Sequence, residues 1–161
     1  MPMAAGAAPH ADATRPGGER ELPLAAMWFL RERVSLNLVP LRVLIVDDSP
    51  RFLHAARALL EHERLEVVGD ASTSAEALRK VLELDPDVAL VDVALGRESG
   101  LELARRLAVA GRRAVPVILI STRDEDDLAD LIADCPSLGF VPKSELSADA
   151  IHRLLAAGRP E

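Results

Sequence analysis

The chain has 161 residues, and its 49% hydrophobic and 28% charged residues give the balance of a soluble globular domain. The formal net charge is -7, and residues 1–40 contain as many arginines as acidic residues, so the excess of acid lies from Leu41 onward. We expect no direct binding of nucleic acid, because phosphate contacts require clustered cations. The single cysteine, Cys135, excludes an intrachain disulfide and favours a cytoplasmic location.

Residues 1–40 form an N-terminal extension whose composition differs from the rest of the chain. Residues 1–21 are rich in Ala, Gly and Pro, which predicts disorder. The apolar run at 22–30 is shorter than the roughly 20 residues that a membrane helix needs, so it predicts neither an anchor nor a signal peptide. Two interpretations of residues 22–36 stay open. They form a short helix that packs on the domain or on a partner, or they have no role and are present only because translation is taken to start at Met1, since Met27 offers a later start codon.

From Leu41 onward, short apolar runs alternate with segments of helical spacing. The runs predict strands at residues 41–46, 65–71, 86–95, 115–121 and 138–143. The other segments predict helices at residues 49–63, 72–84, 99–111, 124–135 and 147–158. Because the strands are continuously apolar, both of their faces should be buried. We therefore predict an α/β fold over residues 41–158, a doubly wound five-stranded parallel sheet with helices on both faces.

Acidic side chains stand at the ends of two predicted strands. Asp47 and Asp48 follow the first strand, and Asp92 lies near the end of the third. The carboxyl ends of parallel strands share one edge of the sheet, where three carboxylates would repel one another. A divalent cation removes this repulsion, and Mg²⁺ prefers oxygen ligands. The pattern predicts a Mg²⁺ site of Asp47, Asp48 and Asp92, with the backbone carbonyl of Ala94 as a further ligand.

Two further polar residues end the fourth and fifth predicted strands. A hydroxyl from Ser121 and an ammonium from Lys143 would suit a phosphoryl group arriving on Asp92, because such transfer needs mainly positioning and charge stabilisation. No separate nucleophile is needed if Asp92 is itself the acceptor. Taken alone, Ser121 would be an ordinary strand-end hydroxyl and Lys143 a surface charge.

The motifs VLIVDD, DVALVDVALGRESG, VILIST and GFVPK occur in this order at strand ends, and together they resemble the receiver domain of two-component response regulators. The resemblance covers about residues 41–158 and implies a flavodoxin-like, chemotaxis-regulator-like fold with strand order 2-1-3-4-5. It also implies that Asp92 is the phosphoacceptor, assisted by Lys143 and Ser121. Ser121 and Phe140 fall at the positions of the family's switch residues.

Some positions near the motifs agree with the family and others depart from it. Gly100 matches the usual glycine eight residues after the acceptor, but Gly96 stands where a proline is common. Ser144 follows Lys143 where many members have proline, and Pro142 precedes the lysine instead. This arrangement resembles the subgroup that carries a helix-turn-helix output.

We expect a stand-alone receiver that is phosphorylated by a sensor histidine kinase or a phosphotransfer protein in the presence of Mg²⁺. The resemblance implies that it signals by altered protein binding on the face formed by residues 124–157. A homodimer is left open as a further partner, and the short apolar runs predict no membrane contact. Three alternatives stay open: the receiver part of a helix-turn-helix regulator, a receiver-like module that is never phosphorylated, and a small phosphatase. The last would want a second acid where Ala94 stands, so we expect no enzymatic activity beyond the chain's own phosphorylation and dephosphorylation.

Overall fold

A computed structural model describes residues 39–109 and 114–158, so the segment at 22–36 lies outside the described residues. The strands are β1 (Arg42–Val46), β2 (Glu66–Ala71), β3 (Val88–Asp92), β4 (Ala94–Leu95), β5 (Glu98–Ser99), β6 (Val117–Ser121) and β7 (Gly139–Pro142). The helices are α2 (Pro50–His62), α3 (Ser74–Leu84), α4 (Gly100–Leu107), α5 (Glu125–Ala133) and α6 (Ala148–Ala157), with a short 3-10 helix η1 (Lys143–Glu145). Within the two described stretches, no helix combines the length and apolar character needed to cross a membrane.

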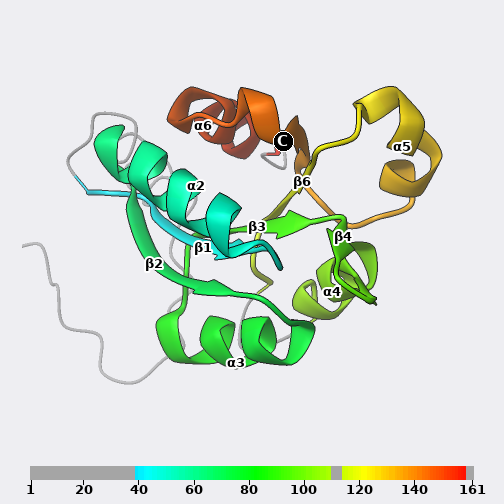
Figure 1. The fold of residues 1–161 in the computed structure, drawn as a ribbon, viewed down its shortest axis with the longest axis horizontal. Coiled ribbons are helices and arrows are strands. Elements are labelled where there is room, and N and C mark those ends of the chain that lie inside the picture. Colours follow the sequence, from blue (N-terminus) through cyan, green and yellow to red (C-terminus); the bar gives the residue numbers. More distant parts are fainter. Residues whose placement is uncertain (1–38, 110–113, 159–161) are drawn as a thin grey trace, which may run out of the picture.

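Five of the strands form one parallel sheet in the order β2-β1-β3-β6-β7 (Figure 1). This order is the predicted 2-1-3-4-5 arrangement, with the two strands β4 and β5 forming a separate small sheet. In the ladder, Val46 of β1 lies beside Val91 of β3, which places the ends of these two strands next to each other. The predicted fold class is therefore confirmed, and β1 and β3 deliver their terminal residues to one point.

Helices cover both faces of the sheet, as continuous apolar strands require. Neighbouring residues of β1 point to opposite sides: Leu44 belongs to the core under α3, α4 and α5, and Ile45 belongs to the core under α2 and α6. Leu103 of α4 and Leu60 of α2 are fully buried in these two cores. Each such side chain contributes about 2 kcal/mol through removal from water. The sheet is thus packed between two apolar layers, which fix the positions of the residues at the carboxyl ends of its strands.

Four helices begin with a side-chain cap directly after a loop. The hydroxyl oxygens of the N-cap residues accept backbone N–H groups of the first turn, and these residues are Ser49, Thr73, Ser99 and Ser147. Such caps satisfy N–H groups that have no partner within the helix. All five helices start within two residues of the predicted positions, because caps and apolar spacing are both visible in the sequence.

The segment after β3 differs from the prediction. The strand predicted at 86–95 ends at Asp92, and Ala94–Leu95 instead pairs in antiparallel fashion with Glu98–Ser99. The turn between them uses Gly96 at a φ of +61°, which proline cannot adopt, because its ring fixes φ near −65°. Gly96 therefore allows a tight hairpin directly after Asp92.

Candidate functional site

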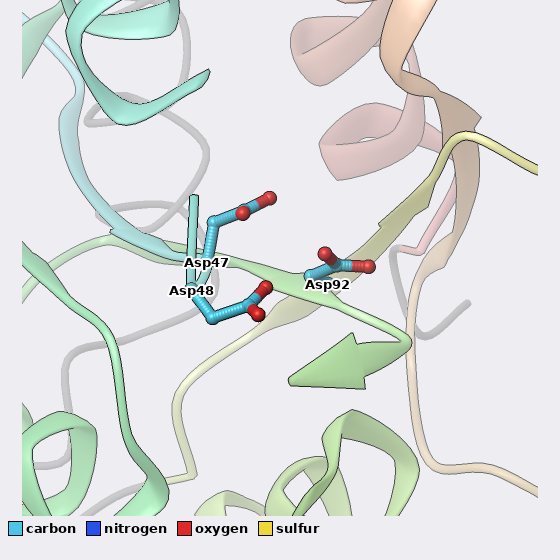
Figure 2. A group of neighbouring side chains, drawn as sticks. All are labelled: Asp47, Asp48 and Asp92. Carbon is cyan, nitrogen blue, oxygen red and sulfur yellow. The ribbon is translucent and has the colours of Figure 1, made fainter. Parts of the chain in front are cut away.

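Three carboxylates meet at the carboxyl edge of the sheet. Asp47 and Asp48 follow β1, and Asp92 is the last residue of β3. Figure 2 shows the three side chains projecting from neighbouring strand ends, and one carboxylate oxygen from each lies within 4.8 Å of the others. The structure thus brings together the three residues predicted to bind Mg²⁺.

Lys143 completes this cluster from the other side of Asp92. Its ammonium nitrogen lies 2.5 Å from Asp47 Oδ2 and 3.0 Å from Asp92 Oδ2. The same nitrogen lies 4.4 Å from the centroid of the Phe52 ring on α2, a distance typical of a cation–π contact. Lys143 begins η1 directly after β7 and does not end the strand as predicted, so the chain turns as it delivers the ammonium to the carboxylates.

Burial sets the ionisation of the cluster. Asp47 is fully buried and Asp92 is 6% exposed, whereas Asp48 is exposed. Burial raises the pKa of Asp92 above its ordinary value, and the Asp47 charge adds to the rise, although Lys143 and the Ala94 amide oppose it. Burial alone would lower the pKa of Lys143, but its two carboxylate neighbours outweigh burial and raise it. One lysine therefore stays charged between two carboxylates that it does not fully neutralise.

The donor set fits a divalent cation that prefers oxygen. All three side chains offer carboxylate oxygens, and together they carry more negative charge than Lys143 balances. The buried Asp47 Oδ2 makes no hydrogen bond of good geometry, although Lys143 lies close to it, and such orphaned buried oxygens call for a partner. The three carboxylates would hold Mg²⁺, which prefers oxygen ligands and would neutralise their excess charge.

Ser121, the last residue of β6, lies on the strand next to β3. Its side chain is buried, and its hydroxyl oxygen accepts the backbone N–H of Arg123 at 3.0 Å. In the ladder, Asp92 pairs with Ile120, so Ser121 lies one residue beyond the level of Asp92 on the neighbouring strand. Because the Ser121 hydroxyl is the acceptor in the bond with Arg123, its own hydrogen is not used in it.

Phe140 on β7 is already inside the protein. The side chain is 8% exposed and belongs to the core beneath α3, α4 and α5. The ring of Phe140 therefore faces the core in the conformation described here. The role of Phe140 as a switch residue stays a prediction.

Close packing explains why a glycine, Gly100, lies eight residues after Asp92. A Cβ built on this residue would lie 1.7 Å from the backbone oxygen of Asp92, which no side chain can tolerate. The Gly100 amide also donates to the Val93 carbonyl at 2.9 Å. The first turn of α4 is thus pressed against the end of β3, which explains the glycine at this spacing.

Some contributors to the site were not expected from the sequence. Nothing in the sequence indicated that the Phe52 ring on α2 would lie against the ammonium of Lys143. The backbone amide of Ser49 donates to Asp47 Oδ1 at 2.8 Å, and the amide of Ala94 donates to Asp92 Oδ1 at 3.2 Å. In both cases an aspartate side chain accepts the backbone N–H of the residue two positions later. Aspartates in turns often make this bond.

The architecture and the acidic edge define a response regulator receiver domain. The family model of that domain matches residues 43–155, so the chain belongs to this family of two-component signalling proteins. The predicted family is confirmed, and with it the flavodoxin-like receiver fold.

Individual relatives agree with this assignment. The response regulator GacA of Pseudomonas viridiflava is 32% identical over 122 residues, which cover 74% of this chain and 56% of that protein. Protein-glutamate methylesterase/protein-glutamine glutaminase 5 of Myxococcus xanthus is 35% identical over 117 residues, which cover 71% of this chain and 34% of that protein. The chain thus spans about half the length, or less, of these curated relatives.

Solved structures show the same fold. The signal receiver domain of a modulated diguanylate cyclase from Desulfovibrio desulfuricans is 30% identical, with a TM-score of 0.62 over 74% of this chain and 94% of that chain. The signal receiver domain of NarL from Mycobacterium tuberculosis is 26% identical, with a TM-score of 0.64 over 76% of this chain and 98% of that chain. These receiver domains and the described part of this chain therefore share one architecture.

Proposed function

We propose that this chain is a phosphorylation-activated switch whose acceptor is Asp92. The observation that carries the proposal is the convergence of Lys143, Asp47 and Asp48 on one nearly buried carboxylate in a receiver fold. The donor would be the phosphohistidine of a sensor histidine kinase or of a phosphotransfer protein. The chain would act in the cytoplasm, where such kinases present their phosphohistidine.

The transfer would use the Asp92 carboxylate as the nucleophile. A carboxylate oxygen attacks phosphorus, the phosphorus–nitrogen bond breaks, and its electron pair stays on the departing imidazole, leaving an acyl phosphate on Asp92. Lys143, 3.0 Å from Asp92 Oδ2, stabilises the charge that gathers on the phosphoryl oxygens. Asp47, Asp48, Asp92 and the Ala94 carbonyl would hold Mg²⁺, which when bound supplies further charge stabilisation to those oxygens.

The acyl phosphate on Asp92 would carry a charge of about −1.5 to −2 in place of the single charge of the carboxylate. Ser121 donates its hydroxyl proton to the new group, and Lys143 moves from the two carboxylates toward it. The face that spans residues 124–157 then changes shape, and a downstream protein or a second copy of the chain that prefers the new shape shifts the equilibrium by its differential affinity. Attack of water on the acyl phosphate resets the switch.

One alternative has a specific observation in its favour. The matched relatives include the transcriptional regulatory protein LiaR of Bacillus subtilis, 29% identical over 122 residues that cover only 57% of that protein. The Pro142-Lys143-Ser144 sequence points the same way, because it resembles the subgroup with a helix-turn-helix output. In that case the chain would be the receiver part of a transcriptional regulator. The phosphoacceptor chemistry would be unchanged.

The direct test is phosphorylation of the full chain by a small acyl phosphate donor, followed by intact mass measurement. We expect one added phosphoryl group in the presence of Mg²⁺ and none in the chelated protein or in the Asp92→Asn variant. An unmodified mass in folded protein, with a known receiver labelled in parallel, would leave the non-phosphorylated interaction module as the better interpretation. Continuous turnover of a generic phosphate ester would instead indicate the phosphatase.

A further inference from the structure

The hairpin of β4 and β5 contains Ala94, whose backbone amide contacts the Asp92 side chain. The turn at Gly96 and Arg97 joins two strands of two residues each, and such short pairing is not stable by itself. Leu95 is 2% exposed and anchors the first strand in the core. The second strand, Glu98–Ser99, has no apolar side chain, so it needs a polar anchor.

Glu98 provides this anchor by reaching a different helix. Its Oε2 accepts the backbone N–H of Ser74, the first residue of α3, at 3.1 Å. This N–H has no partner within the helix, and the positive end of the helix dipole favours a carboxylate there. The N-cap Thr73 accepts a different amide, that of Glu76, at 3.2 Å. Because α3 packs on the sheet through buried residues, the bond fixes the hairpin to a rigid element.

The position of the hairpin is transmitted directly to Asp92. The Ala94 amide donates to Asp92 Oδ1 at 3.2 Å, and Ala94 pairs with Ser99 in the antiparallel ladder. Glu98 pairs with Leu95, so its side chain lies on the opposite face of the hairpin from Ala94 and does not touch the acidic cluster. Glu98 can therefore act on the position of Ala94 through the hairpin backbone, while its charge acts on the cluster through space, and the two effects need separate tests.

We propose that Glu98 is a positioning residue, which ties the acceptor hairpin to α3 and thereby holds Ala94 against Asp92 and in place for the cation. The proposal rests on the proposed function for the bound cation and for the consequence in phosphorylation. The tie between the hairpin and Ala94 is tested in the metal-free chain.

The test compares three substitutions in the full chain. Glu98→Ala removes the bond to Ser74. Glu98→Gln keeps a neutral oxygen that accepts the same N–H. Thr73→Ala is the matched control, because it removes the other side-chain cap of the first turn of α3 and leaves the hairpin bond in place.

Two measurements separate positioning from general stability. In metal-free protein, amide exchange at Ala94 should become several-fold faster in Glu98→Ala and should stay unchanged in Glu98→Gln and Thr73→Ala. In calorimetric titration, Mg²⁺ affinity should fall by roughly tenfold in Glu98→Ala alone, the low end of the loss seen when outer-shell partners of metal ligands are removed. The thermal midpoint should fall in both alanine variants.

Three results would overturn the proposal. Equal losses of Mg²⁺ affinity in Glu98→Ala and Thr73→Ala would show that α3 stability is responsible. A Glu98→Gln variant that behaves like Glu98→Ala would show that the charge and not the hydrogen bond matters. Unchanged Ala94 exchange in Glu98→Ala would show that the hairpin needs no tie. None of these depends on labelling of Asp92, so a failure of the proposed function would be seen separately, in the wild-type mass.

Discussion

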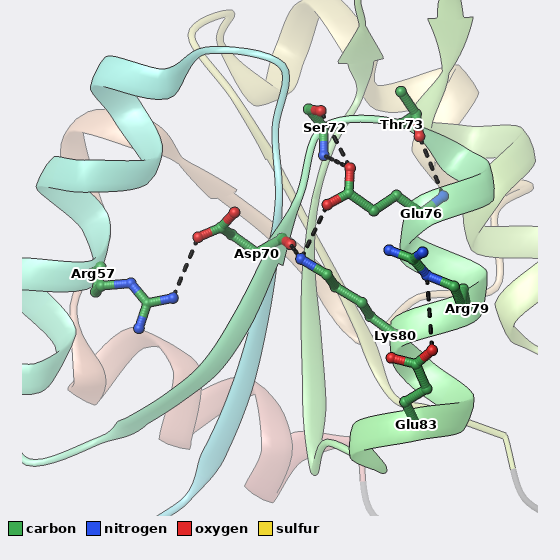
Figure 3. A network of polar contacts seen from close by, with 8 residues as sticks. All are labelled: Arg57, Asp70, Ser72, Thr73, Glu76, Arg79, Lys80 and Glu83. Carbon is green, nitrogen blue, oxygen red and sulfur yellow. Dashed lines mark hydrogen bonds and ion pairs between the residues drawn. The ribbon is translucent and has the colours of Figure 1, made fainter.

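The chain contains two lysines, Lys80 and Lys143. Both contact oxygens of acidic residues, but they differ in how far the contacts are buried. Lys80 on α3 donates to the backbone carbonyl of Asp70 at the edge strand β2 and lies 3.0 Å from a carboxylate oxygen of Glu76 (Figure 3). Lys143 lies between the carboxylates of Asp47 and Asp92. The side chain of Lys80 is 24% exposed and that of Glu76 is 31% exposed. The side chain of Lys143 is only 13% exposed, and the side chains of Asp47 and Asp92 are 0% and 8% exposed.

The difference in burial separates the Lys80 contacts, which only stabilise the fold, from the Lys143 contacts, which belong to a candidate functional site. At the sheet edge, Lys80 meets one charge and one carbonyl, and Arg57 pairs with the Asp70 side chain at 3.2 Å, so the charges balance in contact with water (Figure 3). At the acidic cluster, one ammonium faces two nearly dry carboxylates and a third in solvent. An unbalanced buried cluster costs folding free energy, and such sites are typical of residues that bind a ligand or react.

The largest expected effect is at Lys143. Lys143→Met keeps the apolar stem but leaves Asp47 and Asp92 as neighbouring buried charges, and breaking a buried pair in this way costs about 3 kcal/mol. We expect that loss in the free energy of unfolding, measured by urea denaturation with a chelator present. Mg²⁺ should restore stability more in the variant than in the wild type, because the cation no longer competes with the ammonium. A loss well below 1 kcal/mol in chelator would show that the carboxylates are already neutralised by protonation.

Substitution of Asp92 should change the free energy of unfolding in the opposite direction. Burial raises its pKa, so the fold disfavours the ionised carboxylate, and replacing it with the neutral amide in Asp92→Asn removes that penalty. We expect the metal-free variant to be about 1 kcal/mol more stable than the wild type at neutral pH. The gain should shrink when Mg²⁺ is added, because only the wild type retains all three carboxylates. A variant less stable than the wild type in chelator would mean that Lys143 stabilises ionised Asp92 by more than burial opposes it.

The matching change at Lys80 tests the other half of the comparison. Lys80→Met removes the ion pair with Glu76 and the bond to the Asp70 carbonyl, but water can replace both at this partly exposed edge. We expect a loss of about 0.7 kcal/mol, with no change in Mg²⁺ affinity. A loss as large as that of Lys143→Met would show that the edge contact is not solvated as the exposed fractions indicate.

Much of the acidic cluster was predictable because it depends on a simple rule of topology. Once the apolar runs indicate a parallel sheet, residues after the strands must share its carboxyl edge, which placed Asp47, Asp48 and Asp92 together. The helix starts were predictable for a similar reason, since caps such as Ser49 are local signals.

The remaining details depend on contacts that the sequence pattern does not contain. The hairpin after β3 has strands of two residues, too short for any periodicity, and only the positive φ of Gly96 reveals its turn. The bond from Ser74 to Glu98 joins residues 24 apart, so no local signal marks it. The same holds for the Phe52 ring beneath Lys143, because helical spacing predicts a buried face and not the residue that will lie against it.

The smallest expected effect concerns the charge of Glu76. The hydrogen bond from Lys80, helped by Ser72, lowers the pKa of Glu76 below its ordinary value, although partial burial opposes it. A carboxyl whose pKa is lower in the folded state stabilises the protein above its unfolded pKa, and this contribution is lost as the pH falls through the folded value. Glu76→Gln keeps the hydrogen-bond acceptor and removes the charge. The wild type should therefore be more stable at neutral pH by about 0.3 kcal/mol, a small value because water and salt screen this exposed pair.

The difference between wild type and Glu76→Gln should close as the solution is acidified, in urea denaturation series with a chelator present. Other groups that titrate in the same range cancel, because both proteins carry them. A difference that persists unchanged in acid would show that the glutamate contributes by shape or packing, and the edge contact would then not be electrostatic. A difference that grows to the size expected at Lys143 would remove the contrast between the two lysines, since it would place the Glu76–Lys80 pair in an environment as dry as the acidic cluster.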